Sequence, residues 1–566
     1  MGLNREQYVA AHHMKGPMLV LAGPGSGKTH LLVERIRIMI EEGGIPPDKI
    51  LVITFSKKAA RQMQARFYKN VNDRSYPVTF GTFHAIFYRI IKEEEPSANR
   101  LITEEEQKKF IELSVKECSL CSELFTKSEN TDIVIGLIGA YKNFKDRMYA
   151  RNEQAKDMTE EERGEFEKLL ACYEGKCRDA GLIDFDDMIL LCWQLLYKHE
   201  WVLRKWQAKY EYILIDEFQD INEAQYNVLR LLAGDERNVF AVGDDDQSIY
   251  AFRGACPELM RKFLHQYIGC RRVTLKTNYR CCQNIIGAAD TVIRHNIKRL
   301  ERPMQKHLPS KTGGHVEIVN SESTDVQAEF VCDMIESLMR DHGYSQRDFA
   351  VLYRSEHCGA MFEMRAEERG FALKHEEGRK RISKKQLIHE AYVRAHNNTA
   401  SRADYFLIMN NPERGLSREA LCPDIGNYIG SFKSYYANEP EMLERVYNLE
   451  NMIRNRTWSD EYGGGTSDNL SKNGVNVMTA HASKGLEFKV VFIIGLQEGL
   501  FPHIKSIEEP LVQEERRLMY VAMTRAIERL YMCTVSMEHG KRPSRFAGEA
   551  TEKMQYINDI LKLKRC

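Results

Sequence analysis

Residues 22–29 read Ala22-Gly23-Pro24-Gly25-Ser26-Gly27-Lys28-Thr29, between a short apolar run, Met18–Leu21, and a helix-like pattern, Leu31–Ile40. Glycines let the backbone curl so that its N–H groups point at phosphate oxygens, and a helix N-terminus adds positive potential. The pattern predicts a phosphate-binding loop that holds ATP along residues 22–29. Lys28 would contact the β- and γ-phosphates and the Thr29 hydroxyl would hold Mg²⁺, whereas Ala22 replaces the Gly of the strict motif.

A second segment supplies the acidic residues that such a site needs, and it reads Ile213-Leu214-Ile215-Asp216-Glu217-Phe218-Gln219-Asp220. An apolar strand that ends in Asp-Glu places one carboxylate on Mg²⁺ and a second near the γ-phosphate. We expect Asp216 to be the metal partner and Glu217 to orient and deprotonate the attacking water. An Asp-Glu pair alone is more often a solvated turn. Its occurrence together with the phosphate loop favours the catalytic interpretation.

Short apolar runs recur along the chain with helical patterns between many of them, which predicts α/β architecture with parallel, doubly wound sheets. In such sheets, ligands bind at the carboxyl ends of the strands. The expected strands are Met18–Leu21, Ile50–Phe55, Tyr212–Ile215, Val239–Val242, Val273–Leu275, Phe349–Tyr353, Val475–Thr479, Val490–Gly495 and Leu530–Thr534.

Two long charged stretches interrupt this rhythm and have helical character. We therefore expect two doubly wound α/β cores, each with a mainly helical insertion. The first core would comprise residues 1–86 and 197–277, with residues 87–196 as its insertion. The second would comprise residues 278–383 and 474–566, with residues 384–473 as its insertion.

Composition restricts the class of protein further. Lys plus Arg and Asp plus Glu number 81 each in 566 residues, so a nucleic-acid-binding surface would be a local groove rather than a basic face. The 14 cysteines include Cys118 and Cys121, but no second pair completes a zinc site. No apolar run approaches the roughly 20 residues of a membrane helix. We expect a reducing, cytoplasmic location.

Further motifs follow in an order that resembles the UvrD/Rep/PcrA-type helicases of superfamily 1, and they run from Leu3 to Phe546. Besides the two segments above, the segments that carry the resemblance are Leu3–Gln7, Thr54–Ala60, Thr82–His84, Asp184–Asp187, Gly243–Ala255, Asn278–Arg280, Asn411–Gly415, Thr479–Phe488 and Glu514–Ala526.

The resemblance implies roles at the nucleotide that spacing alone does not assign. Gln7 would bond the adenine base, and Gln247 would sense the γ-phosphate. Arg280 and Arg525 would be the two arginines at the γ-phosphate, where phosphoryl transfer needs cations. Glu487 would approach the ribose or the metal. Because both arginines belong to the second core, ATP would lie between the cores.

The resemblance also implies contacts with a nucleic-acid strand. Base stacking on an aromatic ring contributes roughly 1–3 kcal/mol and tolerates any sequence. Core packing is the commoner role for a lone aromatic residue, but Phe252, between Tyr250 and Arg253, favours strand contact. The candidate contacts are Phe55, Thr82, Phe83, His84, Tyr250, Phe252, Arg253, Thr479 and His481.

What the resemblance implies overall is an ATP- and Mg²⁺-dependent helicase with two RecA-like cores, the second with a reduced insertion. It would move 3′-to-5′ on single-stranded DNA and act at single-strand/duplex junctions, as a monomer or weak dimer. Phe252 stands where the family more often has Trp, and the second insertion looks shortened. Two alternatives therefore stay open: a translocase that strips proteins from single strands with little unwinding, and a motor or recruitment subunit that works with a nuclease or repair partner. An RNA-directed motor is a further alternative.

Overall fold

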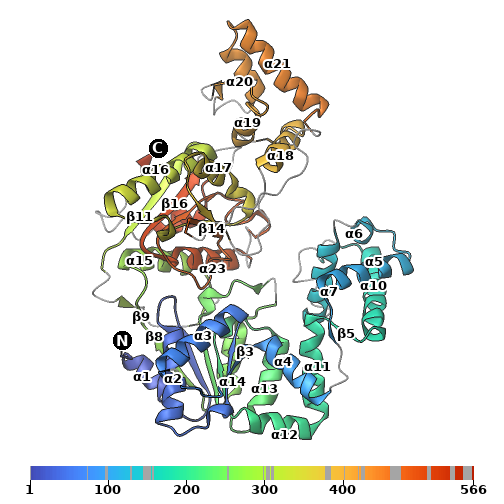
Figure 1. Cartoon of the computed structure of the whole chain (residues 1–566), viewed down its shortest axis with the longest axis vertical. Coiled ribbons are helices and arrows are strands. Elements are labelled where there is room, and N and C mark those ends of the chain that lie inside the picture. Colours follow the sequence, from blue (N-terminus) through green and yellow to red (C-terminus); the bar gives the residue numbers. More distant parts are fainter. Residues whose placement is uncertain are drawn as a thin grey trace. The chain divides into compact units, whose positions relative to one another are not determined.

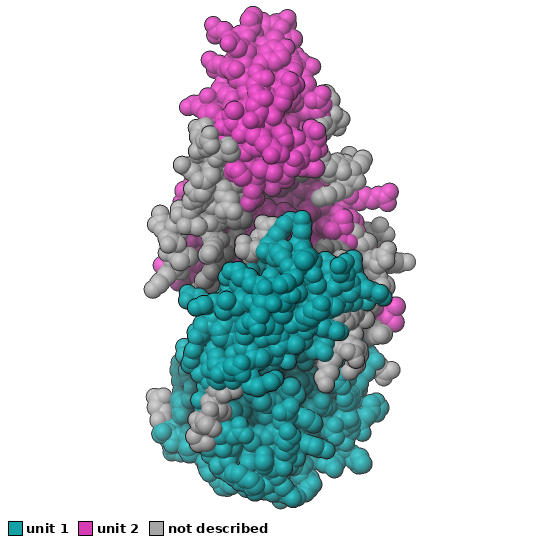
Figure 2. Space-filling view, turned by 90° about the vertical axis from the view of Figure 1, so that its right-hand side faces the viewer, with its two compact units in different colours: residues 1–278, 299–306 teal, residues 279–298, 307–566 magenta. Residues whose placement is uncertain are grey.

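The computed structural model describes residues 2–72, 74–95, 100–127, 130–144, 155, 158–251, 254–297, 299–300, 306–307, 312–375, 384–400, 402–417, 420–421, 427–458, 473–506, 511–535, 542–551 and 564–565. The chain divides into two compact units, coloured separately in Figure 2. Unit 1 comprises Met1–Asn278 and Arg299–Lys306, and unit 2 comprises Tyr279–Lys298 and His307–Cys566.

Unit 1 contains a six-stranded sheet in which every neighbouring pair of strands is parallel. Its order is β3-β2-β6-β7-β1-β8. The strand β1 therefore lies three positions away from β2, the next strand in sequence, so the chain crosses over β7 and β6. The strands are β3 (Thr79–Thr82), β2 (Ile50–Thr54), β6 (Tyr212–Ile215), β7 (Val239–Gly243), β1 (Met18–Ala22) and β8 (Arg271–Leu275).

Alternate side chains of this sheet enter two different cores, because successive residues of a strand point to opposite faces. Met18 and Val20 pack in one core with α1 (Arg5–Ala11), α2 (Lys28–Glu41) and α3 (Lys57–Asn70). Leu19 and Leu21 pack in the other. The helices that pack with Leu19 and Leu21 on this other face of the sheet are α4 (Phe83–Glu94), α11 (Phe185–Lys198), α12 (Glu200–Lys209), α13 (Glu223–Ala233) and α14 (Glu258–Gln266).

The first insertion forms a group of helices with a core of its own (Figure 1). Its strands β4 (Arg100–Leu101) and β5 (Leu182–Ile183) make a short parallel pair. Capping boxes fix the starts of two of its helices, with Thr103 paired to Glu106 and Thr159 to Glu162. The helices are α5 (Glu104–Glu117), α6 (Glu123–Thr126), α7 (Thr131–Phe144) and α10 (Glu160–Asp179).

Unit 2 contains a seven-stranded parallel sheet of order β13-β14-β12-β15-β16-β11-β17. Helices α16 (Thr324–His342) and α17 (Ala360–Glu368) lie on one side of it, and α15 (Gln283–Ile293) and α23 (Val512–Met523) on the other (Figure 1). The strands are β13 (Leu373–Lys374), β14 (Val475–Thr479), β12 (Phe349–Tyr353), β15 (Phe488–Ile493), β16 (Ala526–Val535), β11 (His315–Ser321) and β17 (Lys564–Arg565).

The second insertion contains four described helices whose apolar side chains join the core beside α16 and α17. Tyr392, Phe432 and Leu449 are buried in that shared core. The second insertion thus extends the core of its sheet, whereas the first has a separate core. The helices are α18 (Lys384–His396), α19 (Arg402–Ile408), α20 (Tyr428–Tyr435) and α21 (Pro440–Asn455).

The predicted fold class is confirmed: two doubly wound parallel sheets are each interrupted by a mainly helical insertion. The sequence pattern did not indicate β3, β11, β13 or β17. Two of them contain residues that break an apolar run, Gly81 in β3 and the buried Glu317 in β11. In the part of the chain that the structure describes, no helix has the length and apolar character needed to cross a membrane.

Candidate functional site

The phosphate loop connects the carboxyl end of β1 to the N-terminus of α2, as predicted. Gly27 adopts a φ of +84°, a left-handed conformation that favours glycine, and α2 begins at Lys28. The loop is fastened within unit 1, since Ser26 Oγ donates to the Gly23 carbonyl at 2.7 Å and Asn278 Nδ2 donates to the Pro24 carbonyl at 2.7 Å. The backbone that would receive the phosphates is therefore held in place before any ligand binds.

Gln7 lies against this loop. It is the third residue of α1, where it forms a capping box with Asn4, and its Nε2 donates to the Ser26 carbonyl at 3.0 Å. A Cβ on Gly27 would lie 2.8 Å from this Nε2, so a larger residue there would displace the Gln7 amide. The structure brings Gln7 to the phosphate loop, although its Oε1 already accepts a hydrogen bond from the Asn4 N–H at 3.1 Å.

Lys28, Asp216 and Glu217 gather at the ends of β1 and β6. Lys28 Nζ lies 3.4 Å from Glu217 Oε1, and this buried ammonium makes no hydrogen bond within the described protein. Asp216 is buried and its Oδ1 accepts the Glu217 N–H at 3.0 Å. A buried ammonium with unused donors fits a phosphate oxygen, and Asp216 with Thr29 fits Mg²⁺, which prefers oxygen ligands and phosphates.

Glu217 itself has a left-handed backbone, with φ 53° and ψ 46°. This conformation is uncommon for a residue other than glycine. It turns the chain from β6 into the 3₁₀ helix η4 (Phe218–Asp220). The turn brings Gln219, to which the sequence analysis assigned no role, within 2.5 Å of Glu217 Oε2 through its Nε2.

Gln247 lies in the loop after β7, the strand next to β6. It is buried, and its Nε2 donates to Asp244 Oδ2 at 2.5 Å within the 3₁₀ helix η5 (Asp245–Gln247). The same loop is held from another side by Arg299, whose guanidinium forms two hydrogen bonds with Asp246 at 2.8 and 2.7 Å. Such bidentate pairs fix geometry well. The candidate γ-phosphate sensor thus belongs to a constrained loop.

Unit 2 brings together the three residues assigned to its side of the nucleotide. Arg280 Nε donates to Glu487 Oε2 at 2.6 Å. Arg525 is only 2% exposed, and its guanidinium donates to the carbonyls of Val521 and Leu486 at 2.9 and 3.1 Å. Arg280 therefore has the more accessible guanidinium, whereas Arg525 is bonded to the backbone of its own unit.

Phe55 and Tyr250, two of the predicted strand contacts, form a stacked pair in unit 1. Their ring centroids lie 4.8 Å apart with an interplanar angle of 11°, and Phe55 is 39% exposed. Exposed aromatic faces of this kind suit base stacking. Phe252 and Arg253, the next predicted contacts, lie outside the described residues.

Thr82, Phe83 and His84 form the start of α4. Thr82 is its N-cap and accepts the Ala85 N–H at 3.3 Å. Phe83 packs in the core beneath, so its ring presents no face to solvent. Burial lowers the pKa of His84, which leaves its ring neutral near pH 7. The centroid of this ring lies 5.8 Å from that of Phe185 in an edge-on arrangement, and Phe185 is 57% exposed. Phe185 belongs to Asp184–Asp187, one of the segments that carry the family resemblance. The sequence did not indicate that Phe185 lies beside His84, because that contact depends on the fold.

The remaining predicted contacts, Thr479 and His481, lie in unit 2 at the end of β14. Thr479 Oγ1 accepts the Ala482 N–H at 3.3 Å, and Ser483 Oγ donates to the Ala480 carbonyl at 2.6 Å. The loop continues through Gly485, with a φ of +85°, to Glu487 and β15. One loop therefore joins the candidate strand contacts of unit 2 to its candidate nucleotide contact.

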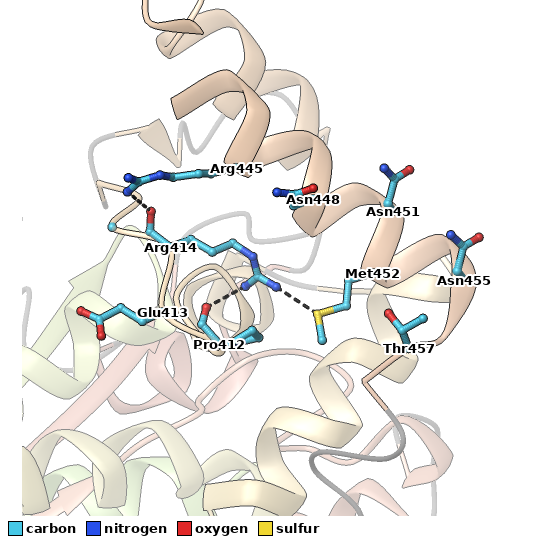
Figure 3. Close-up of a pocket in the computed structure, with 10 residues that line it drawn as sticks. Pro412, Glu413, Arg414, Arg445, Asn448, Asn451, Met452, Asn455 and Thr457 are labelled. Atoms are coloured by element: carbon cyan, nitrogen blue, oxygen red, sulfur yellow. Dashed lines mark hydrogen bonds between the residues drawn. The ribbon is translucent and has the colours of Figure 1, made fainter. Parts of the chain in front are cut away.

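A pocket of about 870 Å³ lies in the second insertion, between α21 and the segment that contains Pro412–Gly415 (Figure 3). Arg414 forms its inner wall, where Nη1 donates to the Pro412 carbonyl at 3.0 Å and Nη2 lies 3.0 Å from Met452 Sδ. The Asn411–Gly415 motif thus lines a polar pocket. None of the residues assigned to the nucleotide lines it.

Comparison with known proteins places both units in one family. The UvrD/REP helicase N-terminal domain matches residues 3–268, and the UvrD-like helicase C-terminal domain matches residues 273–425 and 422–537. The YjcD protein of Bacillus subtilis (strain 168) is 30% identical over 626 aligned positions, covering 96% of this chain and 80% of that protein.

Two further relatives carry the name ATP-dependent DNA helicase PcrA. The protein from Leuconostoc citreum is 28% identical, with 98% of this chain and 85% of the relative covered. The protein from Staphylococcus aureus (strain Mu50 / ATCC 700699) is 30% identical, with 98% of this chain and 86% of the relative covered. Since the two family domains match residues 3–268 and 273–537 and relatives at 30% identity align with nearly the whole chain, this protein belongs to the UvrD/Rep family of helicases.

Proposed function

We propose that this protein is an ATP-dependent DNA helicase that moves along single-stranded DNA in the 3′-to-5′ direction. One observation is the main support for this proposal. In unit 1, the Lys28–Glu217 pair at the phosphate loop connects through Gln219 to the loop that leads to Tyr250, which stacks on the exposed Phe55. A site suited to ATP cleavage and a site suited to base stacking thus share one rigid element.

The proposed chemistry assigns a role to each group. Residues 22–29 bind the phosphates, with Lys28 on the β- and γ-phosphates, and Gln7 contacts adenine. Thr29 and Asp216 hold Mg²⁺, which neutralises charge on the phosphate oxygens when it is bound. Glu217 orients the attacking water and accepts its proton. Gln247, Arg280 and Arg525 stabilise the charge that develops on the γ-phosphate, with Glu487 near the ribose or metal.

Movement would follow from the different affinities of two states for ATP, since a ligand shifts an equilibrium only through such a difference. ATP binding would favour one of the two states, and cleavage would remove that preference. The strand contacts of unit 1 would be Phe55, Thr82, His84, Tyr250, Phe252 and Arg253, and those of unit 2 would be Thr479 and His481. Phe83 supports its neighbours from the core. Alternating grip by the two sets would advance the protein along the strand.

We further propose that residues 1–86 and 197–277 form the first core, with residues 87–196 as its insertion. Residues 278–383 and 474–566 form the second core, with residues 384–473 as its insertion. Single-strand/duplex junctions are the protein's proposed substrate. A reducing, cytoplasmic location suits a chain whose cysteines are free throughout the described regions.

The proposal is tested by measuring steady-state ATP turnover with single-stranded DNA, duplex DNA and single-stranded RNA, beside unwinding of 3′-tailed and 5′-tailed duplexes. We expect single-stranded DNA to stimulate turnover most and the 3′-tailed duplex alone to be unwound. Stimulation by RNA above that by DNA would replace DNA with RNA as the substrate. Turnover that ignores every nucleic acid would contradict a motor function altogether.

The Glu217→Gln variant tests the assigned chemistry. The amide keeps the size of the side chain but cannot accept the proton of the attacking water, so we expect ATP binding to persist and turnover to fall by about 100-fold or more. Equilibrium binding of a fluorescent ATP analogue, together with phosphate release, measures the two properties separately. Turnover at the rate of the unchanged protein would remove Glu217 from its role.

A second candidate activity is translocation that displaces bound proteins with little unwinding. The alignment with YjcD extends over 626 positions, more than the 566 residues of this chain, so the relative has residues within the aligned span that this chain lacks. A shortened second insertion would account for part of the difference. Displacement of a protein block from single-stranded DNA, at a rate far above strand separation of a 3′-tailed duplex, would favour this candidate.

A further inference from the structure

Gln219 is fully buried, at 0% exposure, and its side-chain amide is bonded on both sides. Its Nε2 donates to Glu217 Oε2 at 2.5 Å, and its Oε1 accepts the backbone N–H of Asp244 at 2.9 Å. Glu217 follows β6 and Asp244 follows β7, and these two strands are neighbours in the sheet. A single amide thus spans the ends of two adjacent strands.

The orientation of this amide is determined by chemistry. The Asp244 N–H can only donate, so the atom that faces it must be the amide oxygen, and the NH₂ group must face Glu217. Gly243 permits the approach, because a Cβ at that position would lie 2.6 Å from Gln219 Oε1. The main chain adds a third bond, in which Ser248 Oγ donates to the Gln219 carbonyl at 3.2 Å.

The loop that Gln219 contacts is itself rigid. Asp246 is paired with Arg299, and Asp245 Oδ2 accepts the Leu300 N–H at 2.7 Å. The loop leads directly from Asp244 through Gln247 to Tyr250, whose ring stacks on Phe55. A displacement of the Glu217 carboxylate is therefore transmitted to this loop through one hydrogen-bonded amide, and the reverse holds as well.

We propose that Gln219 is a positioning residue that orients the Glu217 carboxylate for water activation and couples it to the strand-contact loop Asp244–Tyr250. This inference rests on the proposed function and adds a residue and a route to it. The donor arm of the amide, Nε2, holds Glu217. The acceptor arm, Oε1, holds the loop. The donor arm thus sets the orientation of Glu217, and strand contact at Tyr250 influences ATP cleavage through the acceptor arm.

The substitution Gln219→Glu acts on the donor arm, because it keeps an acceptor for the Asp244 N–H but replaces the donor to Glu217 with a carboxyl group that repels the Glu217 carboxylate. A hydrogen bond to a charged group contributes about 1.5–3 kcal/mol, so we expect a kcat about 10- to 100-fold lower with the KM for ATP within about twofold. Because the loop arm remains, the ratio of DNA-stimulated to basal turnover should stay near that of the unchanged protein.

The substitution Gln219→Met removes both arms at similar side-chain volume. We expect the same loss in kcat and, in addition, a stimulation ratio that falls towards one. Gln207→Glu is the matched control, since Gln207 Nε2 donates to the Leu231 carbonyl at 2.8 Å in the same unit, remote from the phosphate loop in sequence and contacts. Its kcat, KM and stimulation ratio should not change. Melting temperatures of all three variants check that they are folded.

Two results would overturn the inference. A kcat for Gln219→Glu within twofold of that of Gln207→Glu would remove the positioning role. An undiminished stimulation ratio in Gln219→Met would remove the coupling role. Failure of the underlying function is distinguishable, because then Glu217→Gln itself would turn over ATP normally. If Gln219→Met does not fold, Gln219→Glu still decides the positioning role. Gly243→Ala, whose Cβ would displace Gln219 Oε1 from the Asp244 N–H, then decides the coupling role by the same ratio.

Discussion

At the scale of single residues, the two candidate arginine contacts of unit 2 differ in how they are held. Arg525 is buried, and its guanidinium is bonded to two backbone carbonyls and to Thr524 Oγ1. Arg280 is paired with Glu487, a carboxylate with 55% side-chain exposure. An ion pair with an exposed partner contributes little to stability. Removal of a buried guanidinium costs more, because the acceptors that it bonded are left without a donor.

We therefore predict that Arg525→Ala destabilises unit 2 by about 3 kcal/mol, because a large, fully buried side chain is removed and the Leu486 carbonyl loses the donor Nη1. Arg280→Ala should destabilise the protein less, because its partner Glu487 is 55% exposed and is solvated once the pair is lost. Differential scanning calorimetry of the full chain measures both against the unchanged protein. Equal melting temperatures for the two variants would show that the guanidinium of Arg525 has no structural role.

At the scale of elements, α23 is fixed to α24 (Arg545–Thr551) by a buried ion pair. Arg516 forms two hydrogen bonds with Glu549, at 2.9 and 2.8 Å, and its Nη1 donates to Asn296 Oδ1 at 2.9 Å. Since α23 continues to Thr524 and Arg525, this pair supports the helix that presents the candidate arginine. Breaking a buried pair is costly because the remaining charge has no partner.

Arg516→Met should accordingly destabilise the protein by about 3–5 kcal/mol by leaving the Glu549 carboxylate buried and unpaired. The double variant Arg516→Met, Glu549→Leu should recover most of that loss, because both charges are gone. Thermal unfolding of the single and double variants provides the comparison. A double variant that melts no higher than Arg516→Met would mean that the loss of stability comes from altered packing of the two side chains and not from the unpaired charge of Glu549.

The elements also indicate how far the sequence could predict this structure. Continuous apolar runs such as Met18–Leu21 and Tyr212–Ile215 were recognised as strands, because strands buried on both faces require such runs. Strand β11 was missed because its buried Glu317 interrupts the pattern, and β3 because of Gly81. Local motifs predicted the phosphate loop and the Asp216–Glu217 strand end.

Contacts between residues distant in sequence were not predictable in the same way. The bond from Gln219 to Asp244 depends on β6 and β7 being neighbours in the sheet. The contact between His84 and Phe185 depends on the packing of α4 against α11. Burial of Phe83 is likewise a property of the folded core. Spacing along the chain contains none of this information.

At the scale of the whole molecule, each of the two units contains residues that we assign to ATP cleavage. Lys28 and Glu217 belong to unit 1, and Arg280, Glu487 and Arg525 belong to unit 2. If each unit contributes to ATP cleavage, removal of a group from either must abolish turnover while leaving both units folded. Lys28 and Arg280 are the suitable pair, because neither is predicted to be essential for stability.

The most direct test is therefore ATP turnover in the presence of saturating single-stranded DNA for the unchanged protein, Lys28→Ala and Arg280→Ala. Loss of one charge that stabilises the transferring phosphoryl group reduces such rates by about 1,000-fold or more. We predict losses of that order in both variants, with melting temperatures close to that of the unchanged protein. Normal turnover in a folded Arg280→Ala variant would contradict the claim that the second unit takes part in cleaving ATP.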